Sequence, residues 1–425
     1  MKRSFSFILA GLVLAGASFA EDSFFDNYVY QSWNSFGGLK GTTATDVIQT
    51  RDGFINIGTY EGLVRFDGLE FTTLRRGKDN NITFASARAL LQDTDGNTWV
   101  CSNDEGLQML SHDGNNLSFT TQNGLPNNSV RAIVEDKKQN IWVGTSAGVV
   151  CLTHEKHLIN PQFEPGTVAK GILCTSLYCD SAGCVWLTTE NEKGLFIFIN
   201  GLFRSAPFMN SFGEYTATAI TQDKQGSYWI ALGTKGIYQI KNGKATRVLT
   251  GTFLDYTTTG TIYPAPDGNI WFGTDEGLVA YSGGKFYECR INGIEGAKIN
   301  KIICDREGNI WISTDRNGVG KLTQGRFKMV KSSNTTNAIA EGRDGTVWLA
   351  TDEGVLAYKN GKQVYNRLTD FTKEIRVRHV EIASNGDILA CCYSKPGLIR
   401  YNPRSGQIKT WSTDDGLAGN YSRRY

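Results

Sequence analysis

The stretch Asp267-Gly-Asn-Ile-Trp-Phe-Gly-Thr-Asp-Glu-Gly-Leu278 decides the fold, because variants of it recur along the chain. Ser129 opens the copy SVRAIVEDKKQNIWVGTSAGVVCL, and Thr336 opens the copy TNAIAEGRDGTVWLATDEGVLAY. Each copy has an alternating apolar run, a D-x-x-G-type turn, a tryptophan between apolar residues, a threonine, and a glycine before another apolar run. Alternation with period two is typical of β-strands. The sequence therefore predicts a repeat built from short strands.

The tryptophans of these copies form one column. Its members are Trp99, Trp142, Trp186, Trp229, Trp271, Trp311 and Trp348, with Asn56 in a first copy and Leu389 in a ninth. Successive intervals are 43, 43, 44, 43, 42, 40, 37 and 41 residues. A period near 42 with several short strands per unit is typical of a four-stranded β-propeller blade. We interpret the column as core between blades rather than as sugar-stacking platforms, because it recurs in one register.

Nine repeats exceed the 4–8 blades of most propellers. The chain runs from a fourth-strand-like segment at Tyr28–Trp33 to another at Ile408–Trp411, and ends at Tyr425 where a tenth repeat would begin. Either one large ring or a seven-bladed propeller followed by a truncated second one fits. We favour the second: a first propeller over 21–330 and further blades over 331–425. The polar connection Lys331–Asn337 lies in the shortest interval.

The first twenty residues resemble a signal peptide. Lys2 and Arg3 precede an apolar run, and Ser18-Phe19-Ala20 offers small residues at a cleavage site. We therefore expect a periplasmic or secreted protein whose mature chain has no membrane span. The 44 basic and 42 acidic residues give no reason to expect nucleic acid as a partner.

Cysteines and histidines give no metal pattern. Nine cysteines contain no C-x-x-C pair, and the four histidines do not cluster with them. The D-x-x-G turns lack the run of oxygen ligands of a calcium loop, so they are interpreted as hairpins. Cys179 and Cys184 flank one such turn, and we predict a disulfide between them. No metal, cofactor or catalytic residue is predicted.

The loops divide between two faces when the strands of each blade are named A to D in chain order. The A–B and C–D turns are repetitive, whereas the B–C and D–A loops vary and are polar. Variable loops on a rigid scaffold are where binding usually lies. The candidate ligand-binding residues there are Tyr60, Glu61, Asn81, Asp104, Glu105, Asn128, Glu190, Tyr215, Tyr256, Asp275, Glu276, Asp315 and Arg316. Carboxylates, amides and tyrosines suit a polar neutral or cationic ligand.

The D-x-x-G-N-I-W-x-G-T-x-x-G-L signature, with Asn-Gly-Leu-Pro-Asn-Asn before Ser129, resembles the two-component regulator propeller repeat. The resemblance covers residues 28–421. It implies a periplasmic sensor region, in which two seven-bladed propellers and a β-sandwich precede a membrane span and a histidine kinase or diguanylate cyclase. This chain has no such span, sandwich or output motif, so the resemblance implies a sensor fragment. An oligosaccharide ligand is suggested by the resemblance alone.

Two other functions stay open at this stage. A protein-interaction scaffold would use the same loops for a protein partner, and propeller–propeller or dimer contacts are expected in either case. A propeller enzyme similar to the virginiamycin B lyases would need a histidine with magnesium. His112, His154 and His157 fall at C–D turns and His379 enters a strand A, so no general base with partners emerges. We therefore predict a small-molecule sensor that is not an enzyme.

Overall fold

The computed structural model describes residues 24–39, 41–77, 81–166, 172–190, 194–208, 216–325 and 335–421. The predicted signal peptide lies outside them. The chain divides into two compact units, Met1–Gly325 and Arg326–Tyr425. In the part of the chain that is described, the first unit contains seven sheets and the second contains two. The predicted all-β propeller of four-stranded blades is confirmed.

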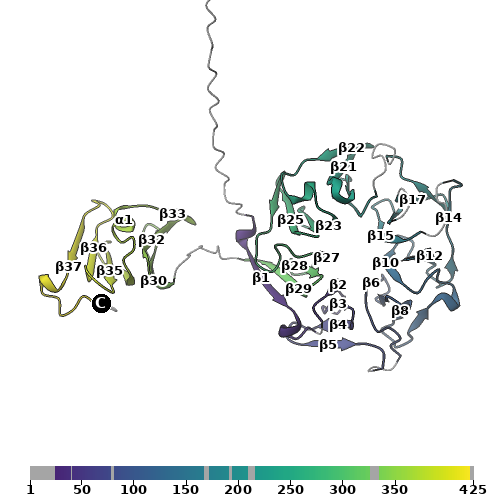
Figure 1. The fold of residues 1–425 in the computed structure, drawn as a ribbon, viewed down its shortest axis with the longest axis horizontal. Helices are drawn as coiled ribbons and strands as arrows, with labels where there is room; N and C mark the ends of the chain where they lie inside the picture. The colour runs from purple at the N-terminus through teal and green to yellow at the C-terminus, as the bar shows by residue number, and fades with distance from the viewer. Residues whose placement is uncertain are drawn as a thin grey trace, which may run out of the picture. The chain divides into compact units, whose positions relative to one another are not determined.

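Each blade of the first unit is built on four antiparallel strands, A to D, with strand A nearest the ring centre (Figure 1). Blades 1 to 3 are β2 (Ala44–Gln49), β3 (Ile55–Thr59), β4 (Gly62–Phe66) and β5 (Phe71–Leu74); β6 (Ala89–Gln92), β7 (Thr98–Cys101), β8 (Leu107–Leu110) and β9 (Leu117–Phe119); and β10 (Val130–Glu135), β11 (Ile141–Thr145), β12 (Gly148–Leu152) and β13 (Leu158–Ile159). Blade 4 is β15 (Cys174–Cys179), β16 (Val185–Thr189), β17 (Leu195–Ile199) and β18 (Leu202–Ser205), with β14 (Gln162–Phe163) added in parallel.

Blades 5 and 6 continue the ring, and blade 7 closes it. They are β19 (Ala219–Gln222), β20 (Tyr228–Ala231), β21 (Ile237–Lys241) and β22 (Lys244–Val248); then β23 (Thr259–Pro264), β24 (Ile270–Thr274), β25 (Gly277–Ser282) and β26 (Lys285–Glu288). Blade 7 takes β27 (Ile299–Cys304), β28 (Ile310–Thr314) and β29 (Val319–Gln324) from the end of the unit and β1 (Tyr28–Trp33) from its start. The register runs from Tyr28 opposite Gln324 to Trp33 opposite Val319. The fourth-strand-like segment at the N-terminus therefore closes the seventh blade.

The second unit repeats the blade twice. Its strands are β30 (Thr336–Glu341), β31 (Val347–Thr351), β32 (Gly354–Lys359) and β33 (Lys362–Val364), then β34 (Val377–Ile382), β35 (Ile388–Cys392), β36 (Leu398–Tyr401) and β37 (Ile408–Trp411). The short helix α1 (Arg367–Phe371) connects the two blades, and Asn366 caps it. Short 3₁₀ turns lie at Phe25–Asn27, Ser35–Gly37, Thr121–Asn123, Gly233–Lys235, Phe253–Asp255 and Thr413–Asp415.

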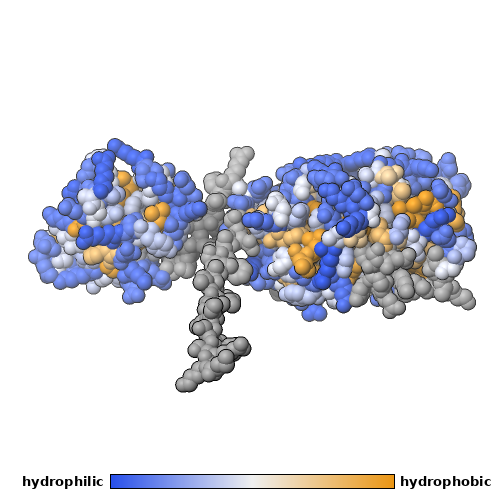
Figure 2. Space-filling model, turned by 90° about the horizontal axis from the view of Figure 1, so that it is seen from above, coloured by the Kyte–Doolittle hydropathy of each residue, from blue (hydrophilic) through white to orange (hydrophobic). Residues whose placement is uncertain are grey.

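The tryptophan column is core, as its register predicts. All seven tryptophans of the column are at most 4% exposed. Trp99 packs with residues of blade 3, such as Val143, and Trp311 packs with residues of blade 1, such as Val47. In the view of Figure 2, hydrophilic residues cover most of each unit, and hydrophobic residues show as patches between them.

Aspartates of the A–B turns hold the tryptophans in place, and three of them, Asp93, Asp180 and Asp305, are buried. In five blades the aspartate that opens the A–B turn accepts a hydrogen bond from the indole N–H six residues later. The pairs are Asp93–Trp99, Asp136–Trp142, Asp180–Trp186 and Asp223–Trp229 at 2.8 Å, and Asp305–Trp311 at 2.7 Å. The same carboxylates accept backbone N–H groups of the turn, for example that of Asn97 at 2.8 Å. We name this arrangement the Asp–Trp clamp. Blade 6 has Ala265 at the aspartate position, and the buried Trp271 Nε1 has no hydrogen-bond partner.

The predicted disulfide is absent, and all nine cysteines are free thiols. Cys179 lies opposite Val185, whose side chain packs between blades 3 and 4. Cys184 packs with Trp186 between blades 4 and 5. Because successive strand residues point to opposite faces, the two sulfur atoms lie on different sides of blade 4. The disulfide prediction was wrong because Cys179 and Cys184, although they flank the same turn, point to opposite faces of the sheet.

Candidate functional site

The face that carries the A–B turns is tied together by hydrogen bonds between blades. A glutamine or glutamate at the end of strand A accepts the backbone N–H of a turn residue in the preceding blade. The pairs are Gln92–Arg51 at 2.7 Å, Glu135–Thr94 at 2.9 Å, Gln222–Ser181 at 3.0 Å and, closing the ring, Gln49–Arg306 at 2.8 Å. These repeated contacts give this face a structural role. The B–C and D–A loops join the other ends of the strands and so lie on the opposite face.

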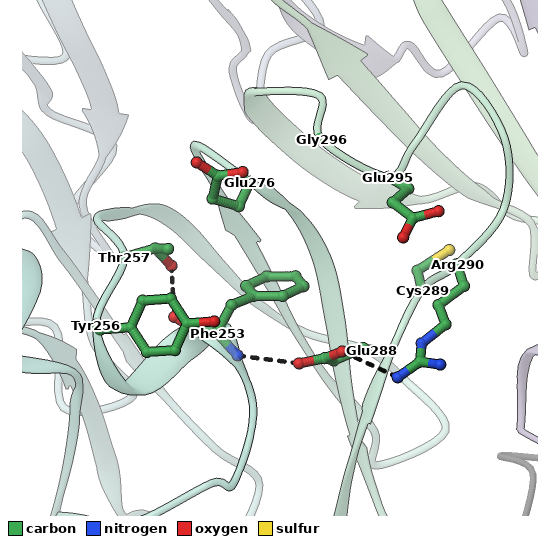
Figure 3. A pocket seen from close by; sticks show the side chains of 9 residues that line it. All are labelled: Phe253, Tyr256, Thr257, Glu276, Glu288, Cys289, Arg290, Glu295 and Gly296. Carbon is green, nitrogen blue, oxygen red and sulfur yellow. Dashed lines mark hydrogen bonds and ion pairs between the residues drawn. The ribbon is translucent and has the colours of Figure 1, made fainter.

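On that opposite face, a cavity of about 460 Å³ lies between the D–A loop of blade 5 and the loops of blade 6 (Figure 3). It is lined by Phe253, Tyr256, Thr257, Glu276, Glu288, Cys289, Arg290, Glu295 and Gly296. The 3₁₀ turn Phe253–Asp255 positions one wall, because Thr252 accepts the N–H of Leu254 and Glu288 accepts the N–H of Phe253 at 3.0 Å. Tyr256 follows this turn and is 68% exposed.

The cavity is acidic, with three carboxylates against one guanidinium. Glu288 is used internally, because it also lies 3.7 Å from Arg290. Among the described residues, the carboxylates of Glu276 and Glu295 make no hydrogen bond or ion pair (Figure 3). Free carboxylates accept hydrogen bonds from hydroxyl or ammonium groups, and an exposed tyrosine ring can stack on an apolar face. Burial raises the pKa of Cys289 to about 12, so its thiol stays protonated and is not a nucleophile at neutral pH.

Two of the thirteen predicted binding residues, Tyr256 and Glu276, line this cavity. Several others have partners within the protein. Asp275 lies 3.2 Å from Lys298, Glu190 lies 3.8 Å from Arg131, Glu105 accepts from Ser102 at 2.7 Å, and Asn128 accepts from Thr121 at 2.8 Å.

The remaining predicted residues do not meet at one point. Asn81 has a left-handed backbone with φ of 68°, and its carbonyl accepts from Gln108 at 2.6 Å. Tyr60, Glu61 and Asp104 lie in B–C loops of blades 1 and 2, and Asp315 and Arg316 lie 3.9 Å apart in blade 7. Tyr215 lies outside the described residues.

The sequence did not single out Glu288, Arg290 or Glu295. They lie at the end of β26 and in the connection to β27, which spans residues 289–298. The signal available in the sequence was that Glu288, Arg290 and Glu295, three charged residues, lie close together around Cys289. The residues predicted in D–A loops, Asn81, Asn128, Tyr215 and Tyr256, all precede the connection between blades 6 and 7.

Histidines and metal ligands give no second site. His112, His154 and His157 lie between strands C and D, and His379 lies in β34. Within the described ranges, no group of three or more His, Cys, Asp or Glu residues could hold a metal ion. The helices of the described part also include none that is long and apolar enough to cross a membrane.

The sequence profile of the two-component regulator propeller matches residues 124–147 and 293–316. Both matches cover a D–A loop, strands A and B, and the start of the next loop. These two segments are therefore similar to the two-component regulator propeller repeat. No curated protein sequence matches the chain.

The similar solved structures include extracellular domains of putative two component systems and a propeller enzyme. The extracellular domain of the putative hybrid two component system BT3049 from B. thetaiotaomicron has a TM-score of 0.68 and 19% identity, over 91% of this chain and 54% of that one. The corresponding domain of BT4673 has a TM-score of 0.56 and 17% identity, over 90% and 53%. Virginiamycin B lyase from Staphylococcus aureus has a TM-score of 0.56 and 17% identity, over 70% and 99%. At these identities the likeness shows a shared fold, and this chain spans about half of the first two domains.

Proposed function

We propose that this protein is an extracytoplasmic sensor module that binds a small polar ligand or oligosaccharide in the cavity beside Tyr256. The observation that carries the proposal is the pair of unpaired carboxylates, Glu276 and Glu295, facing a cavity with an exposed tyrosine. The opposite face has a structural role, which leaves the variable loops for binding. The solved two-component extracellular domains of like fold support the sensor role, and the signal-peptide-like N-terminus supports export. In this proposal the propeller does no chemistry.

Variants of the cavity test this proposal. The chain is screened by thermal unfolding against neutral oligosaccharides, amino acids and polyamines, and the dissociation constant of any ligand that raises the midpoint is measured by calorimetry. We expect Tyr256→Ala and Glu276→Gln each to weaken binding about tenfold, because each removes an interaction worth about 1–2 kcal/mol.

The control is Glu155→Gln, which alters an exposed carboxylate in a C–D turn on the opposite face. It should bind the ligand as tightly as the unmodified protein. The proposal is rejected if no compound of the panel raises the midpoint, or if the two cavity variants bind as tightly as the control.

A further inference from the structure

The innermost strands begin with a shared irregularity. The A–B register shifts at Thr45 in β2, Arg131 in β10, Thr175 in β15, Gly260 in β23 and Asn300 in β27, because each of these residues is skipped in the pairing. Arg88 and Thr218 hold the same position just before β6 and β19. Because strand A is the innermost strand of each blade (Figure 1), these seven positions, all at the start of strand A, surround the ring centre on the face of the variable loops.

At three of these positions a short polar side chain joins neighbouring blades. Thr45 donates to the carbonyl of Ala87 at 2.6 Å, and Thr218 donates to that of Thr259 at 2.7 Å. Asn300 donates to the carbonyl of Ala44 at 2.9 Å across the ring closure. In each case the acceptor directly precedes the equivalent position of the next blade. Three of the seven positions thus join two blades, whereas Thr175 hydrogen-bonds to Thr188 of its own blade at 2.8 Å and Gly260 has no side chain.

Arg88 and Arg131 place long, positively charged side chains at this position in two adjacent blades. Arg88 donates to Asn103 at 3.2 Å instead of reaching the next blade. The Nε of Arg131 is buried without a hydrogen-bond partner, and its side chain is 25% exposed. Arg131 lies 3.8 Å from the carboxylate of Glu190, whose side chain is 67% exposed. The guanidinium charge is therefore weakly compensated.

The two guanidinium groups also repel each other. Burial and the positive charge of Arg131 lower the pKa of Arg88 below its usual value. Repulsion between partly buried like charges destabilises the folded protein. A bound anion would remove this repulsion, and the planar guanidinium matches carboxylate and sulfate oxygens in a two-point hydrogen bond.

We propose that Arg88 and Arg131 bind an oxyanion, the carboxylate or sulfate group of a small molecule, at the start of the innermost strands of blades 2 and 3. This site is independent of the proposed function, because the cavity beside Tyr256 is formed by blades 5 and 6. Occupation of one site does not require the other.

Calorimetry on the whole chain tests the site with sodium sulfate and sodium glucuronate, each against sodium chloride at equal ionic strength. Arg88→Thr and Arg131→Thr install the residue type that joins blades elsewhere in the ring, so both should fold. Each should weaken anion binding at least tenfold. Arg88→Lys and Arg131→Lys keep the positive charge but cannot make the two-point hydrogen bond of a guanidinium group, so they should weaken binding less. The control is Arg75→Thr, which removes an exposed arginine from a D–A loop of the same face.

Binding of sulfate and glucuronate but not glucose, lost in the threonine variants and kept in Arg75→Thr, supports the proposal. Binding of sulfate alone supports the oxyanion site and identifies a free anion, rather than an acidic sugar, as its occupant. The proposal is overturned if neither anion binds the unmodified protein more tightly than chloride. The proposal is also overturned if Arg88→Thr and Arg131→Thr bind the anions as tightly as Arg75→Thr does. If either of these two variants fails to fold, the same comparison is made with Arg88→Lys and Arg131→Lys.

Discussion

Asp180→Ala is expected to lower the free energy of unfolding by about 3–5 kcal/mol, because it leaves several buried donors without an acceptor. The Asp180 carboxylate is 3% exposed. One of its oxygens accepts from Trp186 and from the Tyr228 hydroxyl, both at 2.8 Å. The other accepts the backbone N–H groups of Ala182 and Cys184, both at 2.9 Å. Chemical denaturation monitored by tryptophan fluorescence measures the loss.

Other blades supply the controls for this variant. Asp223→Ala removes a clamp that has no tyrosine partner and should cost less, about 2–3 kcal/mol. Asp267→Ala removes an exposed turn aspartate in blade 6, which has no clamp, and should cost less than about 1 kcal/mol. Ala265→Asp would give Trp271 an acceptor and should stabilise the protein by about 1 kcal/mol. Equal effects of Asp180→Ala and Asp267→Ala would show that the clamp does not hold the blades.

Removal of Phe24–Trp33 should abolish cooperative unfolding of the first unit or lower its midpoint by well over ten degrees. The deletion removes β1, which supplies the fourth strand of blade 7. It also uncovers Trp271, on which Phe24, Phe25 and Tyr28 pack with ring centroids 5.8, 6.0 and 5.7 Å away. Trp33, which stacks on Trp311 at 5.5 Å, is lost as well. An unpaired β29 would then present an open sheet edge. Calorimetric unfolding and light scattering detect the two consequences.

Point variants on β1 separate packing from strand pairing. Tyr28→Ala should cost about 3 kcal/mol, because Tyr28 is buried against Trp271. Val29→Ala alters the adjacent residue, which is 48% exposed, and should cost less than about 1 kcal/mol. If the deleted protein unfolds at the same midpoint as the full chain, the N-terminal strand does not close the ring.

The sequence predicted the blade well because blade packing repeats. A tryptophan recurring in one register fixed the inter-blade core, and the strand-like pattern at Tyr28–Trp33 anticipated the closing strand. The D-x-x-G aspartate was interpreted as a turn residue only. Its second role as acceptor for an indole six residues away depends on both side chains leaving the hairpin on one side, which spacing alone did not show.

The site was less predictable because it depends on contacts that do not repeat. Tyr256 and Glu276 were predicted as binding residues. Glu295, which also lines the cavity, lies in the connection after blade 6 and was not predicted. Two other predicted acidic residues have partners from distant positions, Lys298 for Asp275 and Arg131 for Glu190. The sequence did not show that Arg88 and Arg131 occupy positions where Thr45, Thr218 and Asn300 make hydrogen bonds to the next blade.

Hydrogen exchange measured by mass spectrometry, with and without the ligand that gives the largest thermal shift, tests the central claim most directly. The claim is that ligand binds on the face of the B–C and D–A loops, in the cavity beside Tyr256. We predict slower exchange in peptides that cover residues 252–258, 275–278 and 288–297, with the A–B turns unchanged. Protection confined to the A–B turns, or no protection around Tyr256, would contradict it.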